Sequence, residues 1–313
     1  MQATVAHPAE FRGQGLHSGA AVRMVIRPAP AHHGIWFQRS DLPGRPRVPA
    51  LWDRVVPSKL CTLLDGGNGA TVSTIEHVMA ALAGTGIHNA LIDIDGPEVP
   101  ILDGSAAIFV AGILKAGVRR QAAPVEAIRV TRTVSVRDGA AEATLSPAAQ
   151  LEIDFSIDFA DAAIGRQHKR LDLVNGAFLR ELADSRTFCR QADVTAMQQN
   201  GLALGGTYFN AVVFEGDRVL SPGGLRHEDE PVRHKMLDAV GDLALAGAPL
   251  LAHYEGNRAG HALTNRLLRA LFAEADAWER VVLAPAAAAR LPGPGLHPVP
   301  HRGNPPARRL ATA

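Results

Sequence analysis

Three side chains that can bind a metal or move a proton recur at intervals of one helical turn. His234, Asp238 and Asp242 are each four residues apart, just after Glu230 and Pro231, which are typical of a helix start. At about 3.6 residues per turn they share one face of the helix. Zinc accepts histidine nitrogen and aspartate oxygen, so this face is a candidate metal site. The spacing also suits a solvated stripe with a weak His–Asp pair.

A second group of reactive side chains lies outside this helix. Glu76 and His77 are adjacent near an expected helix start. Ser73 and Glu76 have the spacing of a capping box, which is one interpretation. The other is a ligand beside a general base, because a metal lowers the pKa of bound water and a neighbouring carboxylate takes its proton. His261 is either a helix cap or a group that stabilises an oxyanion or protonates an amine. Thr187 either has a buried hydroxyl with its own hydrogen-bond partner or donates to an oxyanion.

The elements that must position these residues mix strands and helices without strict βαβ alternation. We expect strands over residues 22–26, 34–38, 90–94, 127–136, 142–145 and 151–159, and helices over 74–83, 103–115 (with Asp103 as its cap), 178–182, 231–247 and 261–275. This order favours α+β layers. Residues 117–127 suit a linker, and the Pro- and Ala-rich residues from 284 onward suit a tail that need not pack.

Composition narrows the class of protein. A length of 313 residues suggests about two domains. With 32 basic and 31 acidic residues the net charge is +1, which argues against a non-specific nucleic-acid binder and a polybasic membrane-surface protein. Two cysteines fit a reducing, cytoplasmic compartment, and 13 histidines direct the search for a metal site to histidine and carboxylate. The sequence contains neither a secretory signal nor an apolar run of about 18 residues, so we expect no transmembrane segment.

Read in order, the motifs are far more specific than any one of them. The chain resembles the UDP-3-O-acyl-N-acetylglucosamine deacetylase family, the zinc amidases of lipid A biosynthesis in Gram-negative bacteria, from about Val5 to Phe272. The motifs that carry the resemblance are Gly13-Gln-Gly-Leu-His-Ser-Gly19, Ser73-Thr-Ile-Glu-His77, Asp95-Gly-Pro-Glu-Val-Pro-Ile-Leu-Asp-Gly-Ser105, Arg186-Thr-Phe188, Gly224-Leu-Arg-His-Glu-Asp-Glu-Pro-Val-Arg-His-Lys-Met-Leu-Asp238 and Gly260-His-Ala-Leu263.

The resemblance implies a fold and a metal. It implies two similar α+β domains, each a small β-sheet layered against helices, with the active site at the interdomain cleft. The first domain would cover residues 1–122, the second residues 123–283 and the tail residues 284–313, and residues 187–222 would contribute an acyl-chain passage. His77, His234 and Asp238 match the ligands of one catalytic Zn²⁺, and Fe²⁺ could replace it in such a site.

The resemblance also implies roles for the other residues. The activity would be hydrolysis of the N-acetyl group of UDP-3-O-acyl-N-acetylglucosamine by water activated at the metal. Glu76 matches the general base, His261 the cation that stabilises the oxyanion and assists amine departure, Asp242 the carboxylate that orients His261, and Thr187 an oxyanion donor. Phe188, Asp193, Lys235 and Arg258 match residues near the glucosamine and its nucleotide. We expect a monomer whose partner is the acylated UDP-sugar rather than nucleic acid.

Two alternatives remain open at this point. One is a zinc amidohydrolase of the same fold that acts on a different acylated amine. The other is a catalytically silent paralogue that binds a sugar nucleotide. The acyl-chain length also stays open, because Arg190 and the segment Gly205-Gly-Thr-Tyr-Phe-Asn210 depart from the family pattern.

Overall fold

The computed structural model describes residues 1–67, 69–294 and 296. The N-terminal part of the chain forms a small α+β domain. Its elements are β1 (Ala3–Val5), β2 (Ala9–Gln14), β3 (Ala21–Pro28), β4 (Ile35–Arg39), β5 (Arg47–Pro49), the 3-10 turn η1 (Trp52–Arg54), β6 (Val55–Val56), β7 (Leu63–Asp65), β8 (Thr71–Ser73), α1 (Glu76–Gly84), β9 (Ala90–Ile94), α2 (Ala107–Ala116) and β10 (Val118–Arg120). Five strands form a sheet in the order β2-β3-β9-β4-β5, while β1 pairs with β10 and β6, β7 and β8 form a small sheet of their own.

The C-terminal part is a second α+β domain built on a larger sheet. Its elements are β11 (Glu126–Val130), β12 (Val134–Asp138), β13 (Ala141–Pro147), β14 (Glu152–Asp158), β15 (Arg166–Asp172), α3 (Ala177–Glu181), β16 (Phe188–Arg190), α4 (Gln191–Gln199), β17 (Val212–Glu215), β18 (Arg218–Val219), α5 (Glu230–Leu243), η2 (Ala244–Ala246), β19 (Leu250–Asn257), α6 (His261–Ala273), β20 (Trp278–Val282) and α7 (Pro285–Ala288). The sheet runs β12-β13-β19-β11-β20, and β14 joins it through β19 and carries β15.

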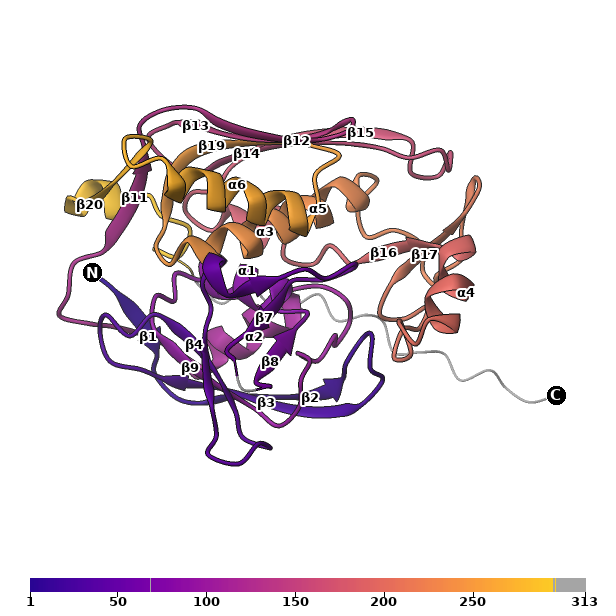
Figure 1. The fold of residues 1–313 in the computed structure, drawn as a ribbon, viewed down its shortest axis with the longest axis horizontal. Coiled ribbons are helices and arrows are strands. Elements are labelled where there is room, and N and C mark those ends of the chain that lie inside the picture. The colour runs from indigo at the N-terminus through magenta and orange to yellow at the C-terminus, as the bar shows by residue number, and fades with distance from the viewer. Residues whose placement is uncertain (68, 295, 297–313) are drawn as a thin grey trace.

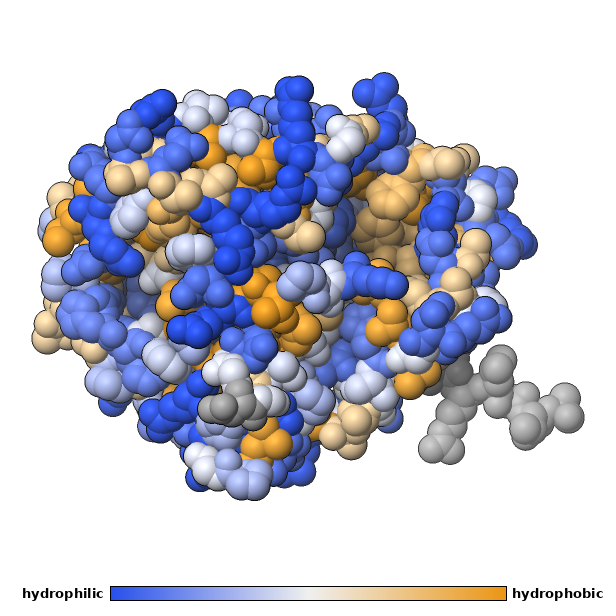
Figure 2. Space-filling view, viewed as in Figure 1, coloured by the Kyte–Doolittle hydropathy of each residue, from blue (hydrophilic) through white to orange (hydrophobic). Residues whose placement is uncertain are grey.

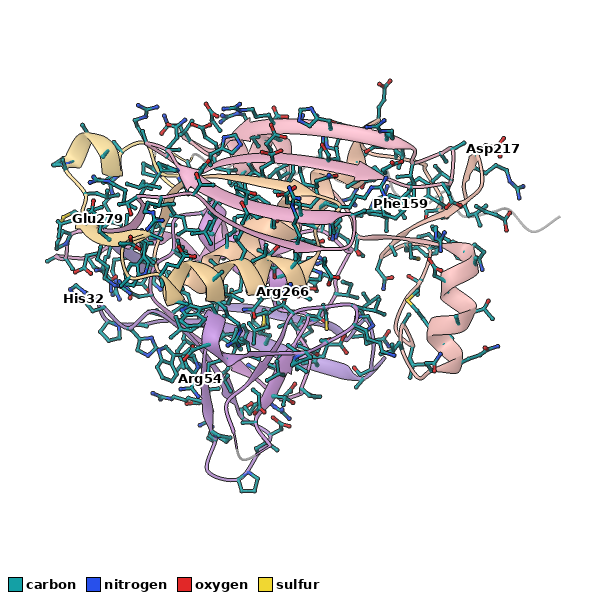
Figure 3. All side chains as sticks on the ribbon, turned by 45° about the horizontal axis from the view of Figure 1, so that its top comes forward. His32, Arg54, Phe159, Asp217, Arg266 and Glu279 are labelled. Atoms are coloured by element: carbon teal, nitrogen blue, oxygen red, sulfur yellow. The ribbon has the colours of Figure 1, made fainter. Side chains whose placement is uncertain are left out.

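The two sheets enclose helices α1, α2, α5 and α6 between them, whereas α4 lies to one side (Figure 1). Helix α2 packs on β2 of the first sheet, α5 and α6 pack on β14, β12 and β13 of the second, and α1 packs against α5 in the middle. The expected two-domain α+β fold is therefore confirmed. Figure 3 shows Phe159, just after β14, at the end of the second sheet near α4, and Glu279 of β20 at the opposite end.

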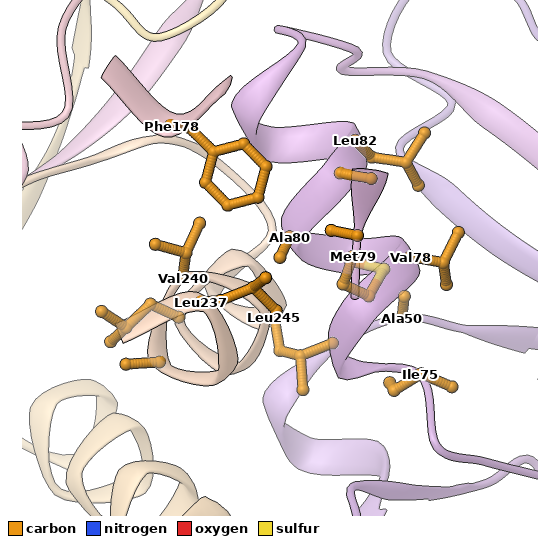
Figure 4. Close-up of a cluster of buried hydrophobic side chains, with 14 of the residues drawn as sticks. Ala50, Ile75, Val78, Met79, Ala80, Leu82, Phe178, Leu237, Val240 and Leu245 are labelled. Atoms are coloured by element: carbon orange, nitrogen blue, oxygen red, sulfur yellow. The ribbon is translucent and has the colours of Figure 1, made fainter. Parts of the chain in front are cut away.

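The apolar centre of the molecule includes the contact between the two domains. Met79 and Ala80 of α1 and Leu237 and Val240 of α5 are buried in one continuous cluster, which Figure 4 shows in part. Polar and charged residues are spread widely over the face drawn in Figure 2. Within the part of the chain that the structure describes, none of the helices combines the length and apolarity that a membrane span requires.

Several expected elements are confirmed within a few residues, and others differ. The strand expected over residues 127–136 is two strands, because β11 pairs with β19 and β20 whereas β12 pairs with β13. Helix α2 begins at Ala107 rather than at the expected Asp103 cap, because Asp103 accepts the N–H and hydroxyl of Ser105 within a turn. The expected linker contains β10, which pairs with β1.

The expected C-terminal tail is not free over its whole length. Residues 285–288 form α7, and the Gly176 N–H donates to the Pro292 carbonyl at 2.9 Å. Gly293 packs closely against Gly86 of the first domain. Residues 295 and 297–313 of the tail lie outside the described residues.

Candidate metal centre

Helix α1 presents Glu76 and His77 as its first two residues, and both are buried. The helix has no side-chain cap. The Ser73 hydroxyl donates instead to the Pro97 carbonyl at 3.2 Å, and the Glu76 Oε2 accepts the Thr62 backbone N–H at 3.1 Å. The capping-box interpretation is therefore wrong. The Glu76 carboxylate turns into the interior, where it is available for chemistry.

Helix α5 carries His234, Asp238 and Asp242 on one face, and all three are at most 5% exposed. The interpretation as a solvated stripe is therefore wrong. The ring Nδ1 of His234 lies 3.0 Å from the Ser185 carbonyl oxygen, which can only accept, so Nδ1 carries the proton. The Nε2 lone pair then faces Asp238, whose Oδ1 is 3.3 Å away. This is how a second residue orients a metal-binding histidine.

His77 meets these two residues from the other domain. One ligand atom from each of His77, His234 and Asp238 lies within 4.8 Å of the others, and the rings of the two histidines meet edge to face at 5.0 Å. The Oδ1 of Asp238 is buried and has no hydrogen-bond partner among the described residues. A buried carboxylate oxygen without a donor is costly unless a cation satisfies it. Burial also lowers the pKa of His234 to about 4, which keeps its imidazole neutral. The three residues therefore fit a metal ion.

Two groups that can exchange protons, His261 and Glu76, lie beside this cluster. The Nδ1 of His261, the first residue of α6, is 2.8 Å from the Asp242 Oδ2, and its Nε2 faces the Glu76 Oε1 at 3.8 Å. Burial alone would lower the pKa of His261, but Asp242 and Glu76 outweigh it and raise the pKa to about 9. Burial raises the pKa of Glu76. The interpretation of His261 as a helix cap is wrong, because Gly260 occupies the N-cap position.

A glycine allows the two helices to bring these groups together. A Cβ on Gly241 of α5 would lie only 2.0 Å from the backbone carbonyl oxygen of Glu76, closer than real Cβ atoms come. Sequence reasoning missed Gly241, and it also missed Thr62, whose hydroxyl donates to the Asp242 Oδ1 at 2.5 Å. A glycine inside an otherwise favourable helix is a weak signal of such close packing. The sequence around Thr62 carries no comparable signal.

Thr187 lies on the segment that also orients His234. Its N–H donates to the Gly104 carbonyl at 2.8 Å, and Ser185 is two residues before it. Between them, the Arg186 guanidinium forms a buried ion pair with Glu230 at the start of α5, at 2.9 Å. This pair fastens the segment to the helix that carries His234. The Arg186 and Glu230 positions belong to motifs of the sequence, and Glu230 was expected at the helix start, but the ion pair between them was not predicted.

The four residues expected near substrate lie in different surroundings. The Phe188 ring is half-buried and lies 6.3 Å from the His234 ring, so it borders the metal cluster. The Lys235 ammonium donates to the Asp238 Oδ2 at 2.6 Å. Asp193 in α4 accepts two hydrogen bonds from the guanidinium of Arg190, the residue just before this helix.

Arg258 lies three residues before His261 and pairs with Asp158. It lines a pocket of about 380 Å³ together with Arg166 and His168 of β15. This pocket lies at the β14–β15 edge of the second sheet, where β19 ends before α6 begins.

Comparisons with known proteins agree with this geometry. Residues 2–273 match the family model described as UDP-3-O-acyl N-acetylglycosamine deacetylase. The chain is 49% identical over 278 residues to the UDP-3-O-acyl-N-acetylglucosamine deacetylase of Phenylobacterium zucineum (strain HLK1), covering 88% of this chain and 95% of that protein. It is 46% identical over 282 residues to the protein of the same name from Shewanella sp. (strain W3-18-1), covering 90% and 92% respectively.

Proposed function

The chain belongs to the UDP-3-O-acyl-N-acetylglucosamine deacetylase family, and from that premise we propose how its buried cluster carries out the reaction. The activity is hydrolysis of the N-acetyl group of UDP-3-O-acyl-N-acetylglucosamine in lipid A biosynthesis. The products are acetate and the free amine of the acylated UDP-glucosamine. The observation that carries the proposal is the set of His77, His234 and Asp238 beside Glu76 and His261.

The metal is proposed to be one Zn²⁺ held by His77, His234 and Asp238. Two neutral imidazoles and one carboxylate are a donor set that zinc accepts, and Fe²⁺ suits the same set. Three protein ligands leave a position for water or substrate, as expected of a catalytic centre. When bound, the ion would lower the pKa of water and polarise the acetamide carbonyl. The unpartnered Asp238 Oδ1 supports this assignment.

Glu76 is proposed as the general base. Its Oε2 is held by the Thr62 N–H, while its Oε1 faces His261 across the site. Burial raises the pKa of the carboxylic acid, which makes the carboxylate a stronger base. Glu76 would take a proton from the attacking water as the new C–O bond forms at the acetyl carbon.

His261 and Thr187 are proposed to stabilise the negative charge that develops on the carbonyl oxygen. Asp242 accepts the Nδ1–H of His261, so the protonated ring presents Nε2–H towards the site. His261 can then pass this proton to the sugar nitrogen as the C–N bond breaks, and the amine leaves. The Thr187 backbone is fixed by Gly104, which supports a defined place for its hydroxyl.

Substrate contacts are proposed on the same basis. Phe188 would pack on the glucosamine, because its ring borders His234. Arg258 would take the diphosphate by exchanging its bond to Asp158, because guanidinium binds phosphate with two parallel hydrogen bonds. Lys235 and Asp193 are each held by a neighbouring side chain, and the Lys235 ammonium keeps further N–H donors for the substrate.

The acyl chain is proposed to lie along residues 187–222. This segment contains three of the large apolar side chains that are exposed in the described residues. They are Leu204, Tyr208 and Phe209, which are 56%, 43% and 75% exposed. Apolar side chains left in water at the surface are typical of a binding site for an apolar ligand.

The test couples metal analysis to the deacetylation assay. Purified protein loaded with zinc should release acetate from UDP-3-O-acyl-N-acetylglucosamine, and no release with zinc bound would exclude the activity. Glu76→Gln should keep its metal and lose most of kcat, whereas His77→Ala should lose both metal and activity. Equal metal loss in the two variants would contradict the base role of Glu76. Release of other acyl groups at a higher kcat/KM would favour a different acylated amine as substrate.

A further inference from the structure

Thr62 forms hydrogen bonds with two carboxylates of the site, those of Glu76 and Asp242. It lies between β6 and β7 in the first domain and is 3% exposed. Its backbone N–H donates to the Glu76 Oε2 at 3.1 Å, and its hydroxyl donates to the Asp242 Oδ1 at 2.5 Å. A side chain of one domain thus holds a carboxylate of the other, and the same residue holds the proposed general base.

Each carboxylate depends on Thr62 for its orientation. In the described part of the chain, the Thr62 N–H is the one hydrogen-bond donor to Glu76. Asp242 accepts two hydrogen bonds there, one from His261 on Oδ2 and one from Thr62 on Oδ1. Two bonds to different oxygens fix the plane of a carboxylate, whereas one bond leaves it free to turn. Loss of the Thr62 hydroxyl would therefore free Asp242 to turn and with it the ring of His261.

We propose that Thr62 is a positioning residue for deacetylation, which sets Glu76 and the Asp242–His261 pair at their working separation across the domain boundary. The inference rests on the proposed function of these three residues. Thr62 itself need not touch substrate, because both of its hydrogen bonds point to the carboxylates. Its effect should therefore appear in kcat and leave KM unchanged.

The test compares Thr62→Val, which keeps the shape and removes the hydroxyl, with Thr62→Ser, which keeps the hydroxyl. Thr62→Val should lower kcat about 10- to 100-fold, the range for a lost hydrogen bond to a charged group, with KM and metal content unchanged. Thr62→Ser should restore most of kcat. Thr85→Val is the matched control, because it removes another buried hydroxyl of the first domain, one that donates to the Ala81 carbonyl in α1.

A double-mutant cycle separates positioning from a general structural effect. In an Asp242→Ala background, Thr62→Val should add little further loss, because the acceptor of the hydroxyl has already been removed. Full kcat in Thr62→Val, equal loss in Thr62→Ser, or fully additive losses in the cycle would each overturn the inference. If Thr62→Val does not fold, Thr62→Ala makes the same comparison. A zinc-loaded wild-type protein without activity would instead contradict the proposed function.

Discussion

The close contact between Gly241 and Glu76 leads to a sharp prediction for Gly241→Ala. The new Cβ would lie 2.0 Å from the Glu76 carbonyl oxygen, 2.8 Å from its carbonyl carbon and 3.0 Å from its Cα. These are backbone atoms at the start of α1, so no side-chain rotation can relieve the overlap. To bring the Cβ–oxygen contact to the shortest separation that Cβ atoms show, α1 and α5 must move apart by about 1 Å.

Two effects of this displacement can be measured. Overpacking should lower the free energy of unfolding by about 1–3 kcal/mol. A shift of about 1 Å between a base and its reacting atom costs about 100-fold in rate, so kcat should fall by that order. The assay is acetate release with zinc at saturation, together with urea unfolding at the same zinc concentration.

A second helical glycine supplies the control. A Cβ on Gly112 of α2 would lie 2.5 Å from the Phe11 ring, on the side of the first domain that packs against β2. Gly112→Ala should lower stability and leave kcat intact. Wild-type kcat in Gly241→Ala at reduced stability would refute the reasoning that this helix contact positions Glu76.

Two further predictions concern charge. Because the Asp242 and Glu76 carboxylates outweigh burial and raise the pKa of His261 to about 9, the catalytic cation persists to that pH and is lost above it. The rate should fall as pH rises through about 9, and in Asp242→Asn the same fall should occur at lower pH. An unchanged basic limb of the pH–rate profile in this variant would exclude His261 as the group that titrates there. Glu230→Ala leaves the Arg186 guanidinium buried without its ion-pair partner, so it should lower the free energy of unfolding by about 3–5 kcal/mol. Urea unfolding at a constant metal concentration measures this loss. A loss below about 1 kcal/mol would show that water replaces the pair.

Some of the site follows from local geometry. The i, i+4, i+8 spacing of His234, Asp238 and Asp242 places them on one face of any helix, because the helical repeat is local. The start of α6 at His261 and the strands β3, β4 and β9 were also predictable from short-range pattern. The order of the motifs then led to the family, which the comparisons confirm.

Other local patterns gave wrong predictions where tertiary contacts compete with them. Ser73 and Glu76 have the spacing of a capping box, but the Ser73 hydroxyl donates to the Pro97 carbonyl and the Glu76 carboxylate accepts the Thr62 N–H. The segment 127–136 has continuous strand character, but its two halves pair with different neighbours. The Ser73 hydroxyl and the Glu76 carboxylate bond to residues outside the expected capping box, and β11 pairs with the distant β19 and β20 whereas β12 forms a hairpin with β13.

The sequence by itself therefore determined which residues are chemically able to act, and through its ordered motifs the family they belong to. Only the tertiary structure decided that His77 of α1 meets His234 and Asp238 of α5, and that Thr62 and Gly241 bring Glu76 to Asp242. The physical reason is the range of the forces involved. Helical periodicity repeats over a few residues and can be read from spacing, whereas helix packing and cross-domain hydrogen bonds join residues more than 150 positions apart.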